Sequence, residues 1–270
     1  MRKGIVWILI LCLTFSMIGC ASAKPGDSAK KERGIKNEKE VIRVGTGGTY
    51  YPFCFQEDGN LQGIEIDIWE AIGRELDCDI EFVVSGFSGL FGLLDTGKVD
   101  IVAHQLNETP ERAEKYIFSE PYLYSNMKFI VAAANDDIND VEDLAGMKVG
   151  VGGETEQSYV LEAAKNADVD VECIMYGDGL NGLTDLEMGR IDAILRSEPA
   201  TLADAKKNNL KIKSVGKPLI IEENNYPMAK NDTELKKKVD QAILTLHEDG
   251  TLTKISEKWL GADITKEPKE

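Results

Sequence analysis

The sequence predicts an α/β fold divided between two lobes. Short apolar runs alternate with amphipathic stretches from about residue 41 onward, as strands and helices do when they follow one another. About 230 residues follow residue 40, and this length exceeds that of one small domain. We expect largely parallel sheets, because strands joined by helical crossovers run in the same direction.

The expected strands are short apolar or β-branched runs bounded by turn residues. They lie at residues 42–46, 80–84, 99–103, 128–133, 148–152, 171–175, 191–195 and 218–221. The expected helices repeat apolar residues at helical spacing, and Thr109 before Pro110 is a typical N-cap and first-turn pair. They lie at residues 64–77, 89–96, 110–115, 157–167, 182–189 and 199–208, with 234–248 and 252–259 closing the chain.

Two interruptions of this pattern indicate how the lobes are connected. One lies at residues 121–128, after the third strand, and the other at 214–219, which contains Gly216 and Pro218. A self-contained run of strands and helices lies between them. We therefore expect the second lobe to be inserted into the first, with two crossing strands as the hinge. Lobe 1 would comprise 41–125 and 217–262, lobe 2 would comprise 126–216, and a polar tail would follow at 263–270.

The first residues predict export from the cytoplasm. Met1-Arg2-Lys3 is basic, and residues 4–16 form an apolar run that is too short to span a membrane comfortably. Met17-Ile18-Gly19-Cys20 resembles the lipobox of bacterial lipoproteins. We expect a signal peptide at 1–19, a lipidated Cys20 and a flexible tether at 20–40. The mature protein would then be extracytoplasmic and lipid-anchored to the cell membrane, and a plain secretory signal is the alternative.

The charge balance restricts the possible partners. Beyond residue 40 the chain carries 23 basic and 43 acidic residues. This surplus of negative charge argues against nucleic acid or anionic lipid as a partner of the folded part. A small anionic ligand remains possible, because local dipoles and one arginine outweigh a distant net charge inside a closed cleft.

Cysteine and histidine are scarce. His104 and His247 are the only histidines, so we expect no metal site, no cofactor and no histidine-based catalytic triad. Once the signal peptide and the lipidated residue are set aside, an odd number of cysteines allows at most one internal disulfide. These cysteines are Cys54, Cys78 and Cys173.

The segment from residue 104 to residue 112 predicts an anion site. A short buried strand at 99–103 leads through polar residues into the helix that begins after Thr109. Free N–H groups at a helix start attract a carboxylate or phosphate, and Arg112 can close on it with two parallel hydrogen bonds. A surface arginine on a capped helix is the alternative.

Further motifs follow one another in a characteristic order. In the first part of the chain they are Thr46-Gly47-Gly48-Thr49-Tyr50-Tyr51-Pro52-Phe53, Gly63-Ile64-Glu65-Ile66-Asp67, Phe87-Ser88-Gly89-Leu90, Gly97-Lys98-Val99-Asp100, Asn107-Glu108-Thr109-Pro110-Glu111-Arg112 and Phe118-Ser119-Glu120-Pro121-Tyr122. In the rest they are Asp143-Leu144-Ala145-Gly146, Gly189-Arg190-Ile191-Asp192-Ala193 and Asp249-Gly250-Thr251-Leu252. From about residue 41 to 261, the chain resembles the polar amino-acid family of extracytoplasmic solute-binding proteins that feed ABC importers.

The resemblance implies a two-lobed fold of the periplasmic-binding-protein type that closes on a small ligand. Tyr50 and Phe87 match the aromatic positions that sandwich the ligand's side chain. Arg112 matches the residue that grips the α-carboxylate. Gln105 and Asn107 match positions that donate hydrogen bonds to the same group.

The second lobe is expected to complete this site, and two positions depart from the family. Thr155 lies at the start of a helix, where its N–H would reach the carboxylate upon closure. Gly47 and Ser197 stand at two positions where the family usually carries an acid. In the family, the acid at the position of Ser197 contacts the ligand's ammonium group. A buried ammonium needs a compensating partner. Glu198 or Glu156 is expected to take this part, unless the ligand lacks an α-ammonium or presents it differently.

These features predict a solute-binding lipoprotein that captures a small amino acid or related carboxylate by hinge closure. It would act as a monomer, need no cofactor or catalytic residue, and deliver its ligand to an ABC permease. Two alternatives stay open. One is an enzyme resembling cyclohexadienyl dehydratase, which would need a general acid in the cleft. The other is a ligand-sensing module for a separate membrane partner.

Overall fold

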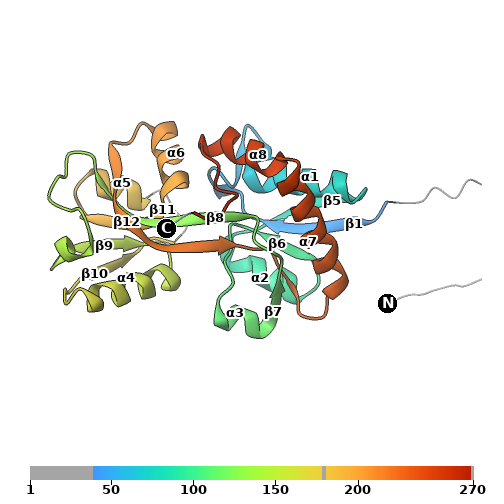
Figure 1. The fold of residues 1–270 in the computed structure, drawn as a ribbon, viewed down its shortest axis with the longest axis horizontal. Helices are drawn as coiled ribbons and strands as arrows, with labels where there is room; N and C mark the ends of the chain where they lie inside the picture. The colour runs from blue at the N-terminus through green and yellow to red at the C-terminus, as the bar shows by residue number, and fades with distance from the viewer. Residues whose placement is uncertain (1–38, 178–180, 269–270) are drawn as a thin grey trace, which may run out of the picture. The chain divides into compact units, whose positions relative to one another are not determined.

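The structure, a computed structural model, describes residues 39–177 and 181–268. The expected signal peptide, Cys20 and nearly all of the expected tether lie outside the described residues. The described part contains two five-stranded sheets and one small three-stranded sheet (Figure 1). No described helix is both long enough and apolar enough to cross a membrane. No disulfide joins the three cysteines of the described part.

The first sheet has the strand order β5-β1-β6-β13-β7. In that order its strands are Asp79–Val84, Val41–Thr46, Ile101–Ala103, Pro227–Ala229 and Tyr116–Phe118. Its helices are α1 (Ile64–Glu75), α2 (Phe87–Asp95), α3 (Pro110–Lys115), α7 (Thr233–Glu248) and α8 (Thr251–Leu260). Buried side chains of α1, α7 and α8 form one core cluster, in which Trp69, Ile72 and Val239 are fully buried. A second cluster joins α2 to β6 and β7.

The second sheet has the strand order β10-β9-β11-β8-β12. In that order its strands are Glu172–Met175, Lys148–Val151, Ala193–Ser197, Leu123–Ala132 and Ile212–Asn224. Its helices are α4 (Glu154–Asn166), α5 (Asn181–Glu187) and α6 (Glu198–Asn208), with a short 3-10 helix at Val141–Leu144. Two clusters of buried aliphatic side chains form its core.

Both sheets are mixed rather than largely parallel. In the first sheet β13 runs antiparallel to β6 and β7, and in the second β8 runs antiparallel to β11 and β12. The expectation was wrong at these strands because it considered only connections through a helix. β12 leads into β13 without a helix between them, and long strands that run beside each other in opposite directions carry the chain between the sheets.

The strands β8 and β12 lie side by side and connect the two sheets (Figure 1). Their antiparallel ladder extends from the pair Leu123 and Asn224 to the pair Ala132 and Ile212. The interruptions expected at 121–128 and 214–219 therefore lie largely inside strands. The ladder shifts register between residues 215 and 220, so the positive φ of Gly216 and the missing N–H of Pro218 are accommodated in a bulge.

A small sheet that the periodicity did not predict carries Tyr50. It consists of β2 (Thr49–Tyr50), β3 (Cys54–Glu57) and β4 (Asn60–Gln62). Its strands are too short for an alternation of apolar and polar residues to be recognised. The dipeptide Asp58-Gly59 between β3 and β4 has positive φ at both residues and was the available hairpin signal.

A buried carboxylate fixes α1 to the ends of the two connecting strands. Glu65 is fully buried and accepts hydrogen bonds from the hydroxyl of Tyr122 (2.5 Å), the hydroxyl of Tyr226 (2.9 Å) and the backbone N–H of Gln105 (2.7 Å). Burial raises the pKa of Glu65 to about 7, and the three donors oppose this rise. Tyr122 precedes β8 and Tyr226 follows β12, so one carboxylate joins both connections.

Candidate ligand-binding site

A pocket of about 590 Å³ is lined by residues that follow or belong to strands of both large sheets. This volume lies in the range of small-molecule sites. The first sheet and its helices contribute residues of α2, the segment after β6 and α3, and the small sheet that is described above contributes Tyr50 of β2. The second sheet and its helices contribute the start of α4, the end of β11, and residues of β8 and β12. The pocket includes these predicted residues: Tyr50, Phe87, Gln105, Asn107, Arg112, Thr155 and Ser197.

Arg112 lies in this pocket and is held in place by Asn107. Its Nη1 donates to the backbone carbonyl of Asn107 (2.9 Å) and to Asn107 Oδ1 (3.0 Å). Its Cζ lies 5.5 Å from the ring centroid of Phe91. The N-cap Thr109 accepts a hydrogen bond from the backbone N–H of Arg112 (3.3 Å). Burial lowers the pKa of Arg112, and the charge of Glu222 opposes this most strongly.

Glu222 is a site residue that the sequence analysis missed. Asn107 Nδ2 donates to Glu222 Oε1 (3.3 Å), and the same nitrogen lies 3.4 Å from the hydroxyl of Tyr159 on α4. Burial raises the pKa of Glu222 to about 7, and the charge of Glu156 adds to the rise. The residue was missed because the strand was expected to end at 221. The strand extends to Asn224, and this extension places Glu222 in the pocket.

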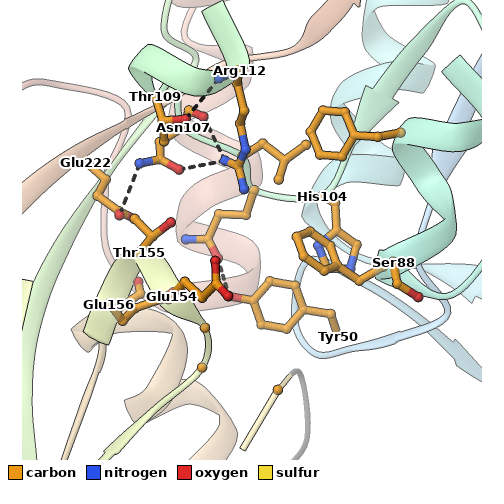
Figure 2. A pocket seen from close by; sticks show the side chains of 18 of the residues that line it. Tyr50, Ser88, His104, Asn107, Thr109, Arg112, Glu154, Thr155, Glu156 and Glu222 are labelled. Atoms are coloured by element: carbon orange, nitrogen blue, oxygen red, sulfur yellow. Dashed lines mark hydrogen bonds between the residues drawn. The ribbon is translucent and has the colours of Figure 1, made fainter. Parts of the chain in front are cut away.

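The aromatic residues Tyr50 and Phe87 pack on a histidine of the protein itself, His104. Tyr50 and His104 are labelled in Figure 2. The imidazole of His104 lies 5.1 Å from the Tyr50 ring at an interplanar angle of 21°. It also lies 5.1 Å from the Phe87 ring, at 42°. The two rings therefore contact a protein side chain rather than forming an empty slot between them. Their contact with a ligand stays a prediction.

Gln105 uses its side chain within the protein. Its Oε1 accepts a hydrogen bond from the Tyr50 hydroxyl, and its Nε2 donates to Ser125 Oγ (2.7 Å). Its φ of 49° lies in the left-handed region, which turns the chain sharply after β6. Gln105 therefore orients Tyr50 beside the pocket, and its expected hydrogen bond to a ligand stays a prediction.

The neighbours of Gly47 leave no space for a side chain at this position. A Cβ at this position would lie 2.7 Å from His104 Nε2 and 3.2 Å from Cys54 Sγ. The imidazole of His104 therefore fills the space that a side chain at residue 47 would need. An acidic side chain at residue 47 would therefore clash with His104 unless the imidazole moved.

Gly47→Asp is expected to lower the free energy of unfolding by about 1–3 kcal/mol, the usual cost of overpacking a filled site. The change forces His104 away from Tyr50 and Phe87. Adding His104→Ala should remove most of the clash, so the two changes should be strongly non-additive in a double-mutant cycle measured by urea unfolding. Additive effects of the two substitutions would contradict this packing.

The second sheet contributes the start of α4 and the end of β11. Thr155 lies in the first turn of α4 between Glu154 and Glu156, and all three line the pocket. Ser197 is buried, and its Oγ has no hydrogen-bond partner among the described residues. Arg196, its neighbour, also lines the pocket. Ser197 thus lines the pocket where the resemblance implied an acid, and its own hydroxyl is buried.

Glu198 is paired within the protein, and its expected contact with a ligand stays a prediction. Its Oε1 accepts a hydrogen bond from Lys128 Nζ (3.0 Å) and another from Ser214 Oγ. Glu198 is absent from the pocket lining, whereas its neighbour Ser197 is present. Consecutive residues at the end of a strand point in different directions, and here only the first faces the pocket. No cluster of His, Cys, Asp or Glu that could hold a metal ion occurs among the described residues.

Comparison with known proteins identifies the family. The family model of bacterial extracellular solute-binding proteins, family 3, matches residues 42–262. The chain belongs to this family. The probable amino-acid-binding protein YxeM of Bacillus subtilis is 35% identical to it over 271 residues, covering 100% of this chain and 99% of that protein.

Two solved structures support the same conclusion. A putative L-cystine ABC transporter protein from Listeria monocytogenes is 33% identical, has a TM-score of 0.74, and matches over 84% of this chain and 98% of its own. The ancestral amino acid-binding protein AncCDT-1, described as a precursor of cyclohexadienyl dehydratase, is 31% identical, has a TM-score of 0.71, and matches over 82% and 95%. The chain therefore has the two-lobed fold and the solute-binding role of this family.

Proposed function

We propose that the protein captures an α-amino acid outside the cytoplasm and delivers it to an ABC import permease. The observation that carries this proposal is the half-buried Arg112, which Asn107 fixes in a pocket lined by residues from both sheets. A fixed guanidinium is suited to a carboxylate, because its paired N–H groups match the two carboxylate oxygens. The names of the relatives, an amino-acid-binding protein and a cystine transporter protein, agree with this assignment.

Capture by closure explains why the pocket draws on both sheets. A ligand that contacts Arg112 from one side and the start of α4 from the other stabilises the closed arrangement relative to the open one. The strands β8 and β12 connect the sheets and are the hinge in this proposal, with lobe boundaries near residues 125 and 217. A monomer suffices for this action, and a lipid on Cys20 would hold it near the permease.

A dehydratase is a second candidate, favoured by one observation. Glu222 has a pKa of about 7 and lines the pocket, so it is partly protonated near neutral pH and could act as a general acid. The similarity to a precursor of cyclohexadienyl dehydratase points in the same direction. Turnover of prephenate or arogenate by the purified protein would support this candidate. If neither compound is turned over, the dehydratase function is wrong and the binding function is retained.

The melting temperature of the purified protein tests the binding function. The panel should contain the standard amino acids, L-cystine and matched carboxylates that lack the amino group. An amino acid present at about 100 times its Kd should stabilise the protein by about 2.7 kcal/mol. We expect the melting temperature to rise by several degrees. If no amino acid raises it, or if only amine-free carboxylates do, the amino-acid assignment is wrong.

A further inference from the structure

The polar wall of the pocket, formed by Arg112, Asn107 and Glu222, carries charges of both signs (Figure 2). We propose that Glu222 binds the α-ammonium group of the ligand, so that the pocket selects a zwitterionic α-amino acid over an amine-free carboxylate. This inference rests on the proposed function and names the group that recognises the amine. It accounts for a site in which Gly47 and Ser197 provide no acid.

The amide of Asn107 fixes the two charged groups relative to each other. Its oxygen accepts a hydrogen bond from Arg112 Nη1 (3.0 Å), and its nitrogen donates to Glu222 Oε1 (3.3 Å). A cation and an anion therefore lie on the two sides of one amide group. The α-carboxylate and α-ammonium of an amino acid are attached to one carbon atom. The polar wall therefore presents the complementary pair of charges, held together through one amide group.

Several elements face Glu222 and determine its charge. Arg112 on α3 favours its ionised form, as does the hydroxyl of Tyr159 on α4. Burial and the carboxylate of Glu156, also on α4, disfavour it and prevail, which raises the pKa of Glu222 to about 7. Ser125 on β8 lies opposite Glu222 in the antiparallel ladder of β8 and β12. A bound ammonium would place a positive charge beside this carboxylate, so the pKa of Glu222 should fall when the ligand binds.

The other carboxylates are less well placed for this role. Asp95 accepts a hydrogen bond from the Tyr116 hydroxyl (2.8 Å), and Glu198 is paired with Lys128 outside the pocket. Glu154 and Glu156 lie in the first turn of α4, and Glu111 is exposed on α3. Within the described part of the chain, no hydrogen bond joins any of these three side chains to Asn107 or Arg112, whereas Glu222 is joined to Asn107. Among the described acids that line the pocket, Glu222 is the one that shares the side chain of Asn107 with Arg112 as a hydrogen-bonding partner. It is therefore the acid best placed to bind the amine of a ligand whose carboxylate contacts Arg112.

The test compares Glu222→Gln with Glu223→Gln, a matched change at an exposed neighbour on the same strand. Binding of three pairs of probes is measured by calorimetry: L-cystine and 3,3′-dithiodipropionate, L-arginine and 5-guanidinopentanoate, L-glutamine and 4-carbamoylbutanoate. For each amino acid that the unchanged protein binds, Glu222→Gln should weaken binding by at least about thirtyfold at pH 7.5, about two powers of ten being usual for a lost buried charge pair. The amine-free partner should change by less than about threefold, and Glu223→Gln should change neither.

The pH dependence provides a second readout. Glu222 must lose its proton to pair with an ammonium, so amino-acid affinity should rise as the pH rises through 7. A pKa of about 7 in the empty site implies an increase of about thirtyfold between pH 5.5 and pH 8.5. The increase should be absent in Glu222→Gln, whereas a general loss of folding would lower affinity at every pH.

The outcomes separate this inference from the proposed function. If the unchanged protein binds an amino acid and Glu222→Gln binds it equally well, the inference is wrong and the proposed function stands. If none of the probes or standard amino acids binds, or only the amine-free carboxylates bind, both are wrong. Equal weakening of an amino acid and its amine-free partner by Glu222→Gln would also overturn the inference, because it would indicate a structural role.

Discussion

Arg112→Gln is expected to weaken amino-acid binding by more than about a hundredfold. The change leaves the ligand carboxylate without its charged partner inside a largely closed pocket. Losing one member of such a buried pair costs about 3–5 kcal/mol, and each 1.4 kcal/mol corresponds to about a tenfold change in Kd. Calorimetric titration of the purified variant with an amino acid that binds the unchanged protein measures this loss directly.

Two further variants separate charge from folding in this experiment. Arg190→Gln removes an exposed arginine that pairs with Asp185 at the surface, and it should leave affinity unchanged. Arg112→Lys keeps the charge but lacks the planar pair of donors, so its affinity should fall between the other two. Retention of nearly full affinity by a folded Arg112→Gln protein would exclude a carboxylate contact at this residue.

Glu65→Ala is expected to lower the free energy of unfolding by about 3–5 kcal/mol, because it leaves buried donors without an acceptor. An unsatisfied buried polar group costs about 1–3 kcal/mol. The change leaves three donors without their acceptor: the hydroxyls of Tyr122 and Tyr226 and the N–H of Gln105. Water entering the space would recover part of the sum of these costs. Urea unfolding followed by circular dichroism measures the change.

The control is Glu70→Ala, which removes an exposed carboxylate from the same helix and should change stability by less than about 0.5 kcal/mol.

The pKa of Glu65 is raised from 4.5 to about 7 in the folded state, so its contribution to stability is fully present below pH 4.5 and is lost as the pH rises through 7. The stability of the ligand-free protein should therefore fall from pH 5.5 to pH 8. Glu65→Gln should remove part of this fall, leaving the similar contribution of Glu222. A stability that rises over this range, or an effect of Glu65→Ala as small as that of the control, would contradict the assignment.

The sequence predicted those features of the fold that depend on local pattern. The helix α3 has the expected bounds, 110–115, and it begins where Thr109 and Pro110 indicated, because capping chemistry is local. The strands β1, β5 and β9 were expected within one residue of their observed bounds, since apolar runs between turn residues suffice to locate buried strands. The short strands β2, β3, β4, β7 and β13 were missed. The strands β7 and β13 are defined by pairing with each other across more than a hundred residues, which no local pattern specifies, and β2 is too short to show an alternation.

The site was predictable where it follows a motif and unpredictable where it depends on pairing. Arg112 and Asn107 lie within one short segment, and the structure brings them together in the pocket, while their contact with a carboxylate stays a prediction. Glu222 enters the pocket only because β12 pairs with β8 beyond the bulge, a register that local sequence does not specify. Glu198 was assigned to the pocket by proximity in sequence, and its ion pair with Lys128 draws it elsewhere.

A crystal structure of the protein with a bound amino acid tests the central claim most directly. The account predicts that the α-carboxylate lies within about 3 Å of the Arg112 guanidinium and that the α-ammonium lies within about 3 Å of a carboxylate oxygen of Glu222. It also predicts that Asn107 remains between the two groups. A ligand whose carboxylate is bound away from Arg112 would contradict the proposed mode of capture. An ammonium bound by other groups would retain the capture function but exclude the role of Glu222.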